Sequence, residues 1–211
     1  MDKTVLYNLS YGLYAIGVND NGRKCGCIVN TVFQVTSADP IIAISMNKEN
    51  YTYSVIARTK RFSVSILSEK VNPNVIAALG FASGRDTDKF AGIGSGMVGD
   101  LPILSENCCG YFLCDVVSMT ETSTHFVILA KVQDAFGNSG LPPMTYQYYH
   151  DVIKGKAPKN APTYVAEEKT GVYRCSVCGY LHEGDFASEP DGYVCPICGA
   201  PKAKFQLNSP K

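Results

Sequence analysis

The chain has 211 residues, of which 19 are basic, 19 are acidic and 45% are hydrophobic. This is an ordinary globular composition, and its balanced charge gives no indication of nucleic acid or anionic lipid as a partner. No apolar run is long enough to span a bilayer and no hydrophobic signal segment follows Met1, so we expect a cytoplasmic protein with no membrane partner.

The first 150 residues are rich in patterns typical of strands, separated by turn residues and short helical stretches. The predicted strands cover residues 12–18, 25–30, 40–46, 61–67, 110–120 and 125–132. Asn21-Gly22 predicts a hairpin turn, and the apolar run 40–46 predicts a strand buried on both faces. Many strands with few helices predict a mainly β domain, a barrel or compact sheet with peripheral helices.

Two short helices are predicted, over 51–59 with Asn50 as N-cap and over 74–79. Residues 83–99 are rich in Gly, Ser, Asp and Lys and are expected to form a surface excursion with one turn at Lys89-Phe90. Residues 133–141 are expected to form a loop.

Polar side chains gather at two strand ends of this domain. Residues 30–36 carry amides and hydroxyls where a strand should become a loop, and residues 45–52 bring Lys48 to a helix start. Free N–H groups at a helix start, beside a positive charge, suit a phosphate monoester. The chain has no Gly-x-Gly-x-x-Gly and no Walker sequence, which argues against a Rossmann domain or a P-loop. The alternative is a capped helix start without a ligand.

Taken in order, Asn30-Thr31-Val32-Phe33-Gln34-Val35-Thr36-Ser37, then Asp39-Pro40, an apolar strand and Asn47-Lys48-x-Asn50-x-Thr52 resemble the flavin reductase family over roughly residues 1–150. The resemblance implies an FMN-binding split β-barrel that forms a homodimer, with FMN near the subunit interface. The positions implied to bind FMN around the isoalloxazine edge are Thr31, Val32, Phe33 and Gln34, with Asn30 directly before them. The positions implied to bind its phosphate are Ser45, Asn47, Lys48, Asn50 and Thr52.

His125 opens a predicted strand where related flavin reductases often carry a histidine near the flavin face. The resemblance implies that it positions a nicotinamide or donates to reduced flavin, and the alternative is a partly buried histidine with satisfied hydrogen bonds. His150 ends the tyrosine-rich stretch 146–150, which we expect to pack a barrel end or a subunit interface.

The composition changes at Lys154, where a polar, basic stretch interrupted by proline begins. We therefore expect three parts: an FMN-binding domain over 1–153, a linker over 154–171 and a small metal domain over 172–211.

The small domain carries two Cys-x-x-Cys pairs, Cys175/Cys178 and Cys195/Cys198, with sixteen residues between them. Four thiolates at this spacing predict a tetrahedral site for zinc or iron. A glycine follows each pair and lets the backbone turn its N–H groups toward the sulfurs. His182 lies between the pairs and is expected to be solvated, since four cysteines leave no need for another ligand.

Tyr173, the Cys-Gly-Tyr at 178–180 and the Cys-Pro-Ile-Cys-Gly at 195–199 resemble a rubredoxin, a one-iron electron carrier, over roughly the last forty residues. The gap between the pairs is shorter than in a typical free-standing rubredoxin and closer to versions fused to other domains. The cysteine spacing alone leaves a structural zinc ribbon open.

Five further cysteines have no metal-type spacing and are expected to be small buried hydrophobes in a reducing compartment. They are Cys25, Cys27, Cys108, Cys109 and Cys114. The alternative is a redox-active dithiol formed by Cys25 and Cys27 or by Cys108 and Cys109.

The whole arrangement resembles the high-molecular-weight rubredoxins. This resemblance implies oxidation of NADH, with NADPH left open, electron transfer through FMN to an Fe(Cys)4 centre, and reduction of a flavodiiron-type protein that removes nitric oxide or oxygen. Two alternatives remain: a stand-alone flavin or ferric reductase with a structural zinc ribbon, and a flavin-binding module without turnover.

Overall fold

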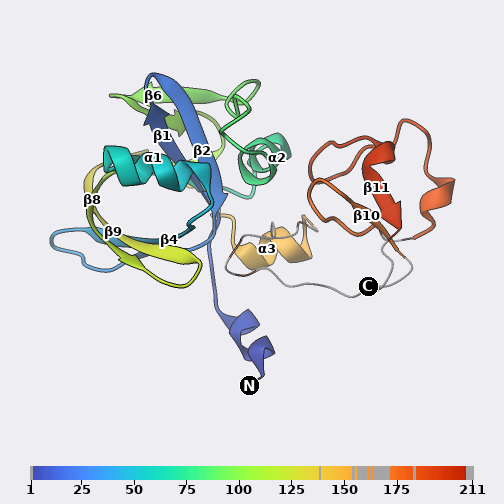
Figure 1. The fold of residues 1–211 in the computed structure, drawn as a ribbon, viewed down its shortest axis with the longest axis horizontal. Coiled ribbons are helices and arrows are strands. Elements are labelled where there is room, and N and C mark those ends of the chain that lie inside the picture. The colour runs from blue at the N-terminus through green and yellow to red at the C-terminus, as the bar shows by residue number, and fades with distance from the viewer. Residues whose placement is uncertain are drawn as a thin grey trace.

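The structure is a computed structural model that describes residues 2–137, 139–153, 155, 161, 163, 172–182 and 184–207. A curled sheet and its helices form the larger part, which we call the barrel, and residues 172–207 form a small part, which we call the ribbon (Figure 1). In Figure 1 the ribbon lies beside helices α2 and α3 of the barrel.

The barrel is a seven-stranded antiparallel sheet in the order β2-β1-β5-β8-β9-β4-β3. Its strands are β1 (Tyr14–Asp20), β2 (Arg23–Val29), β3 (Val32–Gln34), β4 (Ile41–Asn47), β5 (Arg61–Leu67), β8 (Cys108–Glu121) and β9 (His125–Phe136). The helices are α1 (Tyr51–Thr59), α2 (Pro73–Phe81) and α3 (Tyr146–Asp151), with a 3-10 helix at Lys3–Asn8. These elements confirm the predicted mainly β domain with few, short helices.

The β1–β2 hairpin has the turn that Asn-Gly predicts. Asp20 pairs with Arg23, so Asn21 and Gly22 alone form the loop, and both have positive φ, 53° and 91°. A two-residue loop with both φ values positive matches the twist of the strands that it joins. This hairpin aligns β2 so that Asn30 directly follows its last residue, Val29.

Helix α1 begins where its capping residue predicts. Asn50 is extended, and its Oδ1 accepts a 2.9 Å hydrogen bond from the backbone N–H of Thr52. Val55 and Ile56 on the helix are fully buried against core residues of the sheet such as Ile16. Because burying an aliphatic side chain of this size contributes about 1.5–3 kcal/mol, this contact fixes the helix and its N-terminus on the sheet.

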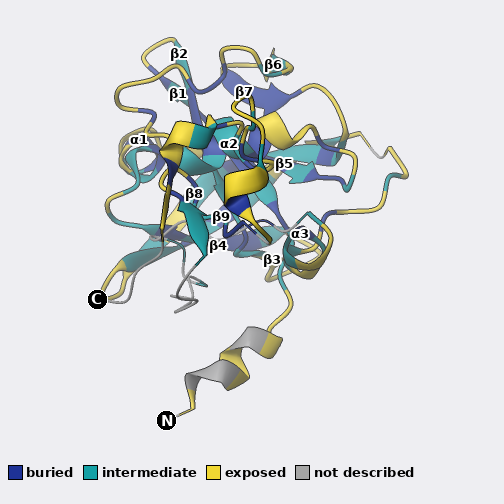
Figure 2. Cartoon of the chain, turned by 90° about the vertical axis from the view of Figure 1, so that its right-hand side faces the viewer, coloured by how far each residue is buried: buried dark blue, intermediate teal, exposed yellow. Residues whose placement is uncertain are grey.

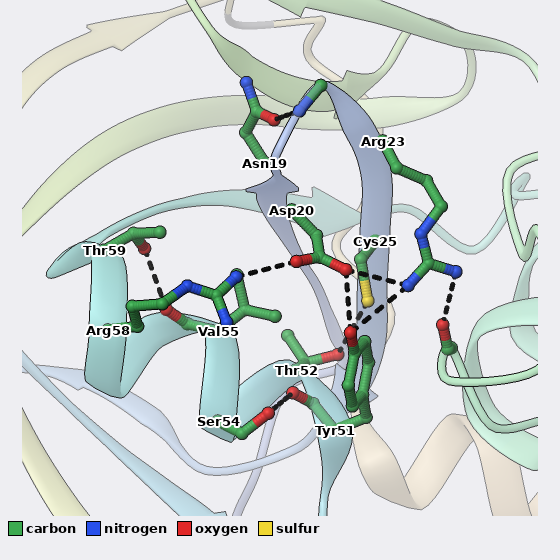
Figure 3. Close-up of polar contacts among 12 residues, drawn as sticks. Asn19, Asp20, Arg23, Cys25, Tyr51, Thr52, Ser54, Val55, Arg58 and Thr59 are labelled. Atoms are coloured by element: carbon green, nitrogen blue, oxygen red, sulfur yellow. Dashed lines mark hydrogen bonds and ion pairs between the residues drawn. The ribbon is translucent and has the colours of Figure 1, made fainter.

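An ion-pair network ties the same helix to the β1–β2 hairpin (Figure 3). The buried carboxylate of Asp20 accepts hydrogen bonds from Arg23 and Tyr51, both at 2.8 Å, and from Arg58 at 2.7 Å. These donors, with Arg23 first, lower the pKa of Asp20. Since Tyr51 is the first residue of α1, the network positions the helix start beside β1.

Buried residues follow the barrel strands, whereas many loops and helix surfaces are exposed (Figure 2). In β4 the consecutive residues Ile42, Ala43 and Ile44 are all buried, which confirms the prediction of a strand covered on both faces. The predicted packing of the spare cysteines is confirmed for Cys25, Cys27 and Cys114, which are buried thiols, while Cys108 and Cys109 are partly buried.

The structure departs from the sequence predictions in three places. Strand β9 continues to Phe136, through part of the expected loop at 133–141. Within 83–104 the chain forms an unpredicted hairpin of β6 (Ser95–Val98) and β7 (Leu101–Leu104). Lys89 and Phe90 are buried rather than exposed, because Phe90 joins a second apolar cluster with Leu79 of α2. The expectation of a surface excursion was therefore wrong at these two residues.

The tyrosine-rich stretch forms α3, whose Tyr149 is buried in that second cluster together with Leu13 and Met144. It packs one end of the barrel, which is one of the two roles expected for it.

The ribbon is built on a two-stranded sheet of β10 (Tyr173–Cys175) and β11 (Phe205–Leu207), with short 3-10 helices at Phe186–Ser188 and Lys202–Lys204. Its core contains cysteines and aromatic rings together with Ile197 and Ala200, and Tyr173 stacks on Phe186 at 4.4 Å between ring centroids.

Candidate functional site

A cavity of about 710 Å³ lies where the barrel meets the ribbon. This volume falls within the range typical of small-molecule and cofactor sites. Its walls are formed by the end of β2, the end of β4, the start of α1, the end of α2 with the loop that follows, and the first cysteine pair of the ribbon.

Six of the predicted site residues line this cavity. They are Asn30, Thr31, Ser45, Asn47, Asn50 and His125. The backbone brings them together because β4 returns beside the chain that leaves β2: the Ser45 N–H donates to the Thr31 carbonyl at 3.2 Å, and the Thr31 hydroxyl donates to the Ser45 carbonyl at 3.1 Å. Amide and hydroxyl groups from two segments of the chain, 30–31 and 45–50, thus share one wall.

His125 opens β9 directly opposite Asn47 in the β4–β9 register. Its Nδ1 lies 2.8 Å from the hydroxyl of Thr124. The histidine therefore faces the same cavity as the strand-end amide of Asn47.

The other five predicted residues do not line the cavity. Phe33 and Gln34 lie in the edge strand β3, where Phe33 is 62% exposed and the Gln34 amide donates to the Thr36 carbonyl. Val32, in the same strand, packs against the main core. Lys48 pairs with Glu121, and Thr52, in the first turn of α1, is buried with its hydroxyl 3.8 Å from the Cys25 sulfur.

Lys89 lines the cavity and was not predicted as a site residue. It is 5% exposed, and its ammonium donates to the Leu79 carbonyl at 2.6 Å. Burial lowers the pKa of Lys89. A buried cation with hydrogen-bonding capacity left is the kind of group that an anion stabilises.

Gly84 and Cys27 complete this side of the cavity. A Cβ on Gly84 would lie 2.7 Å from the Cys25 sulfur, so only glycine lets the loop approach β2 this closely. Burial raises the pKa of Cys27, which keeps it a neutral thiol.

The donor set fits a phosphorylated flavin. Hydroxyls, side-chain amides, a helix N-terminus and a buried ammonium can bind a phosphate and the polar edge of a heteroaromatic ring. Asn47, Asn50 and Lys89 would hold the anionic part, and Asn30, Thr31 and Ser45 the polar edge of the ring.

The second candidate site is the cluster of Cys175, Cys178, Cys195 and Cys198, whose sulfurs all lie within 4.8 Å of one another. The Cys175–Cys198 and Cys178–Cys195 sulfur pairs are 3.7 and 3.5 Å apart. A metal with bonds of about 2.3 Å at the centre of a regular tetrahedron holds its sulfurs about 3.8 Å apart. The four cysteines therefore fit a tetrahedral zinc or iron ion.

The two cysteine pairs have the same backbone arrangement, and we call residues 175–180 the first knuckle and 195–200 the second. Gly179 and Gly199 have φ of 81° and 68°, and their N–H groups donate to the carbonyls of Cys175 and Cys195 at 2.9 and 2.8 Å. The predicted glycine turns are confirmed.

Backbone amides also reach the sulfurs, as predicted: that of Tyr180 donates to Cys178 and that of Ala200 to Cys198. The hydrogen bond shared by the sulfurs of Cys178 and Cys195 lowers the pKa of Cys195 and raises the pKa of Cys178. Because metal binding requires all four thiolates, it releases protons from this cluster.

His182 is not solvated as expected. It is 6% exposed, its Nε2 lies 2.8 Å from a carboxylate oxygen of Glu189, and its ring packs edge-on against Phe186 and Tyr193. Its role in the ribbon is packing around the metal site.

The ribbon contacts the barrel through apolar groups, and the segment before the ribbon contacts it through polar groups. Phe81 at the end of α2 and Ile153 pack against the cysteine-rich core of the ribbon. Thr163, from the segment between the two parts, accepts a 2.8 Å hydrogen bond from the Asn30 amide and donates to the Tyr146 hydroxyl at 2.8 Å.

Among the described residues, no helix combines the length and the apolar character that crossing a membrane requires.

Two family models match the chain. The flavin reductase like domain matches residues 6–155, and the rubrerythrin, rubredoxin-like domain matches residues 173–206. The two matches together contain both candidate sites.

Two characterised proteins are similar to this chain, the first over 98% of its length and the second over 78%. The high molecular weight rubredoxin of Moorella thermoacetica is 38% identical over 227 aligned positions, covering 98% of this chain and 99% of that protein. The ferric-chelate reductase (NAD(P)H) of Archaeoglobus fulgidus is 35% identical over 166 positions, covering 78% of this chain and 98% of that protein.

Solved structures share the fold of the barrel. The NADH:FAD oxidoreductase of Streptomyces globisporus aligns with a TM-score of 0.62 and 16% identity over 67% of this chain and 83% of that one. Flavoredoxin from Methanosarcina acetivorans aligns with a TM-score of 0.56 and 21% identity over 62% of this chain and 70% of that one.

Proposed function

The chain belongs to the flavin reductase family and is a homologue of the high-molecular-weight rubredoxins, and from this we propose that it carries electrons from NAD(P)H through FMN to an Fe(Cys)4 centre and on to a flavodiiron-type protein. The coarser part of this assignment, a flavin reductase domain joined to a rubredoxin-like domain, suggests flavin-linked electron transfer.

One observation carries the proposal: the cavity that fits a phosphorylated flavin is walled on one side by the first knuckle of the metal site. Cys175 and Cys178 line the same cavity as Asn30 and Asn50, although between 125 and 148 positions of sequence separate them. Electron transfer between two centres requires that they come close, and a shared wall provides this.

When bound, FMN accepts a hydride and releases its two electrons singly, and the iron carries one electron at a time. Each NAD(P)H would therefore yield NAD(P)⁺, one proton and two electrons, delivered to the protein acceptor in two successive one-electron steps.

We assign the residues of the cavity as follows. Lys89 and the amides of Asn47 and Asn50 bind the phosphate, since they provide the buried cation and the neutral donors. Asn30 and Thr31 orient the ring edge. His125 faces the cavity at the end of β4 and is assigned to the nicotinamide or to the reduced ring.

Three expected FMN contacts that do not line the cavity remain part of the proposal, because FMN is expected to lie near the interface of a homodimer. Phe33, Gln34 and Val32 lie in the edge strand β3, which pairs with β4 and has no second partner among the described strands. The domain limits 1–153, 154–171 and 172–211 and a cytoplasmic location are proposed with it.

The visible spectrum and the metal content of aerobically purified protein test the proposal. We expect one flavin and one iron per chain, with flavin bands and ferric–thiolate bands that both bleach when NADH or NADPH is added anaerobically. A colourless protein that contains only zinc would refute it.

A ferric reductase with a structural zinc ribbon is the second candidate, favoured by the 35% identity to the Archaeoglobus fulgidus protein. It predicts bound flavin with zinc in the ribbon, and reduction of ferric chelates that does not change when the ribbon metal is removed. Growth with both metals supplied guards against adventitious loading, because a four-thiolate site takes either.

A further inference from the structure

The four metal ligands have different surroundings on the two sides of the ribbon. Cys178 is 3% exposed and lines the cavity with Cys175. Cys195 is also buried, whereas Cys198 is the one ligand of the four that is partly exposed to solvent. The metal site therefore faces the cavity on one side and reaches solvent on the other.

One valine lies on each of these two sides of the metal site. Val177, inside the first pair, is 45% exposed and lines the cavity together with Leu207, whereas Val194, directly before the second pair, is 53% exposed and does not line it. The two knuckles have the same backbone hydrogen bonds, so this difference comes from the position of the ribbon on the barrel and not from the knuckles themselves.

Two apolar side chains of the same chain contact the ribbon, and a third residue fixes the segment that leads to it. Phe81 and Ile153 pack against its core, and Thr163 bridges Asn30 in the cavity wall to Tyr146 of α3. The first knuckle thus faces the cavity of its own chain.

We infer that electrons enter the metal site through the first knuckle from the flavin of the same chain, and leave through the second knuckle, where the surface of Val194, Pro196 and Cys198 docks a one-electron-accepting redox protein. This inference rests on the proposed function and adds the path and the docking surface. One electron enters and one leaves in each passage, so the iron returns to its ferric state and no proton is taken up.

The partner chemistry follows from what the second knuckle exposes. Val194 and Pro196 are exposed beside the partly exposed sulfur ligand Cys198. An apolar surface around a redox centre suits a protein whose own electron acceptor lies near an apolar patch, because contact excludes water and shortens the distance between the two centres.

Two matched variants separate the sides: Val177→Asp and Val194→Asp. Each places one carboxylate next to a metal-ligand pair without removing a ligand. In stopped-flow traces we expect Val177→Asp to slow flavin-to-iron transfer by about tenfold or more while leaving iron-to-cytochrome c transfer unchanged, since a charge in an apolar contact weakens it by this order. Val194→Asp should do the reverse and leave reduction of ferricyanide, a small acceptor, unchanged.

Hydrogen exchange of zinc-loaded protein tests, without turnover, how the ribbon is positioned on the barrel. We expect slower exchange of the amides at 176–180 than of those at 196–200, and faster exchange at 176–180 in Val177→Asp but not in Val194→Asp. Equal exchange of the two knuckles, or both variants slowing the same transfer step, would overturn the inference.

Mixed subunits test whether the path stays within one chain. A Cys178→Ser chain is co-expressed with a Lys89→Met chain, at an FMN concentration that leaves the second one empty. We expect no flavin-to-iron transfer in the mixture, and recovery of up to half the wild-type amplitude would overturn the single-chain path. A wild-type chain that binds flavin and iron but shows no transfer would instead refute the proposed function. The exchange data would still report the position of the ribbon on the barrel.

Discussion

Asn30 and Thr163, which are 133 positions apart in the sequence, are joined by a 2.8 Å hydrogen bond from the Asn30 amide to the Thr163 hydroxyl. The same hydroxyl donates to Tyr146. A residue of the cavity wall, a helix of the barrel and the segment that leads to the ribbon therefore meet at one oxygen atom.

Replacing Thr163 with Val removes this oxygen and keeps the shape of the side chain. Each hydrogen bond contributes about 0.5–1.5 kcal/mol, so we expect the segment to detach more often, with exchange of the first-knuckle amides increased about fivefold or more. Tyr146→Phe removes one of the two bonds and should give a smaller effect. Unchanged exchange in both variants would show that Phe81 and Ile153 hold the ribbon without help from Thr163.

Lys89→Met tests the buried cation of the cavity. A charge-assisted hydrogen bond to a phosphate contributes about 1.5–3 kcal/mol, so we expect the Kd for FMN to rise by about one to two orders of magnitude. Flavin fluorescence titration measures this. Lys24→Met is the matched control, because Lys24 bonds to Ser95 and does not line the cavity. Equal FMN affinities in the two variants would show that the phosphate does not bind at Lys89.

The same lysine predicts a dependence on pH. Burial lowers the pKa of Lys89, so the free protein loses this charge at a pH below the ordinary lysine range. We expect FMN affinity to fall as pH rises through the lowered pKa, and Lys89→Met to lack this fall. The flavin-free fold responds in the opposite direction: between the lowered and the ordinary pKa the unfolded chain binds more protons, so stability rises with pH.

Cys178→Ser tests the division of labour between the two sites. It removes one of four metal ligands, and we expect loss of bound iron and of electron transfer to a protein acceptor, while NAD(P)H-dependent flavin reduction continues within about twofold of wild type. Metal analysis and stopped-flow absorbance measure the two effects. Cys109→Ser, outside the metal cluster, should change neither. Collapse of flavin reduction as well would give the ribbon a structural role in the cavity.

Asp20→Asn tests the network that holds α1. Asp20 is buried, but its partners Arg23 and Arg58 are 38% and 52% exposed and therefore screened by water, so we expect a loss of about 1–2 kcal/mol in the free energy of unfolding at pH 7. Asp115→Asn, which removes an exposed pair with Arg61, should lose less than about 1 kcal/mol. Urea denaturation of both variants measures the difference.

This contribution should disappear in acid. The pKa of Asp20 is lowered in the folded state, first by the hydrogen bond from Arg23, so its stabilisation is present above the ordinary carboxyl pKa and is lost as pH falls through the lowered value. Wild type and Asp20→Asn should therefore begin to converge in stability below about pH 4 and become equal once the pH lies below the lowered pKa. A constant difference down to pH 2 would mean that the asparagine disrupts packing and not the charge.

Features that depend on neighbours in the sequence were predictable. The Asn21-Gly22 turn, the Asn50 cap and the two glycine turns of the knuckles each follow from the conformation that one residue prefers. The metal cluster was predictable for the same reason, since each cysteine pair is a short local loop and only one long-range approach is needed to complete it.

Features that depend on distant contacts were not predictable. Lys89 is charged and lies among glycines and polar residues, and only the packing of Phe90 beneath α2 carries it into the cavity. His182 is buried because Phe186 and Tyr193 pack around it. The position of the first knuckle on the cavity depends on Phe81, Ile153 and Thr163, none of which has a local pattern that indicates a contact with another part of the chain.

The hydrogen bond at Thr163 also limits how far the ribbon can travel. Only ten positions separate Thr163 from Tyr173, and a chain of that length spans at most about 36 Å. A ribbon confined within this radius meets its own cavity at an effective concentration in the millimolar range. Transfer inside the chain should then be independent of dilution, and a free ribbon domain added in solution would need millimolar concentrations to compete with the tethered one.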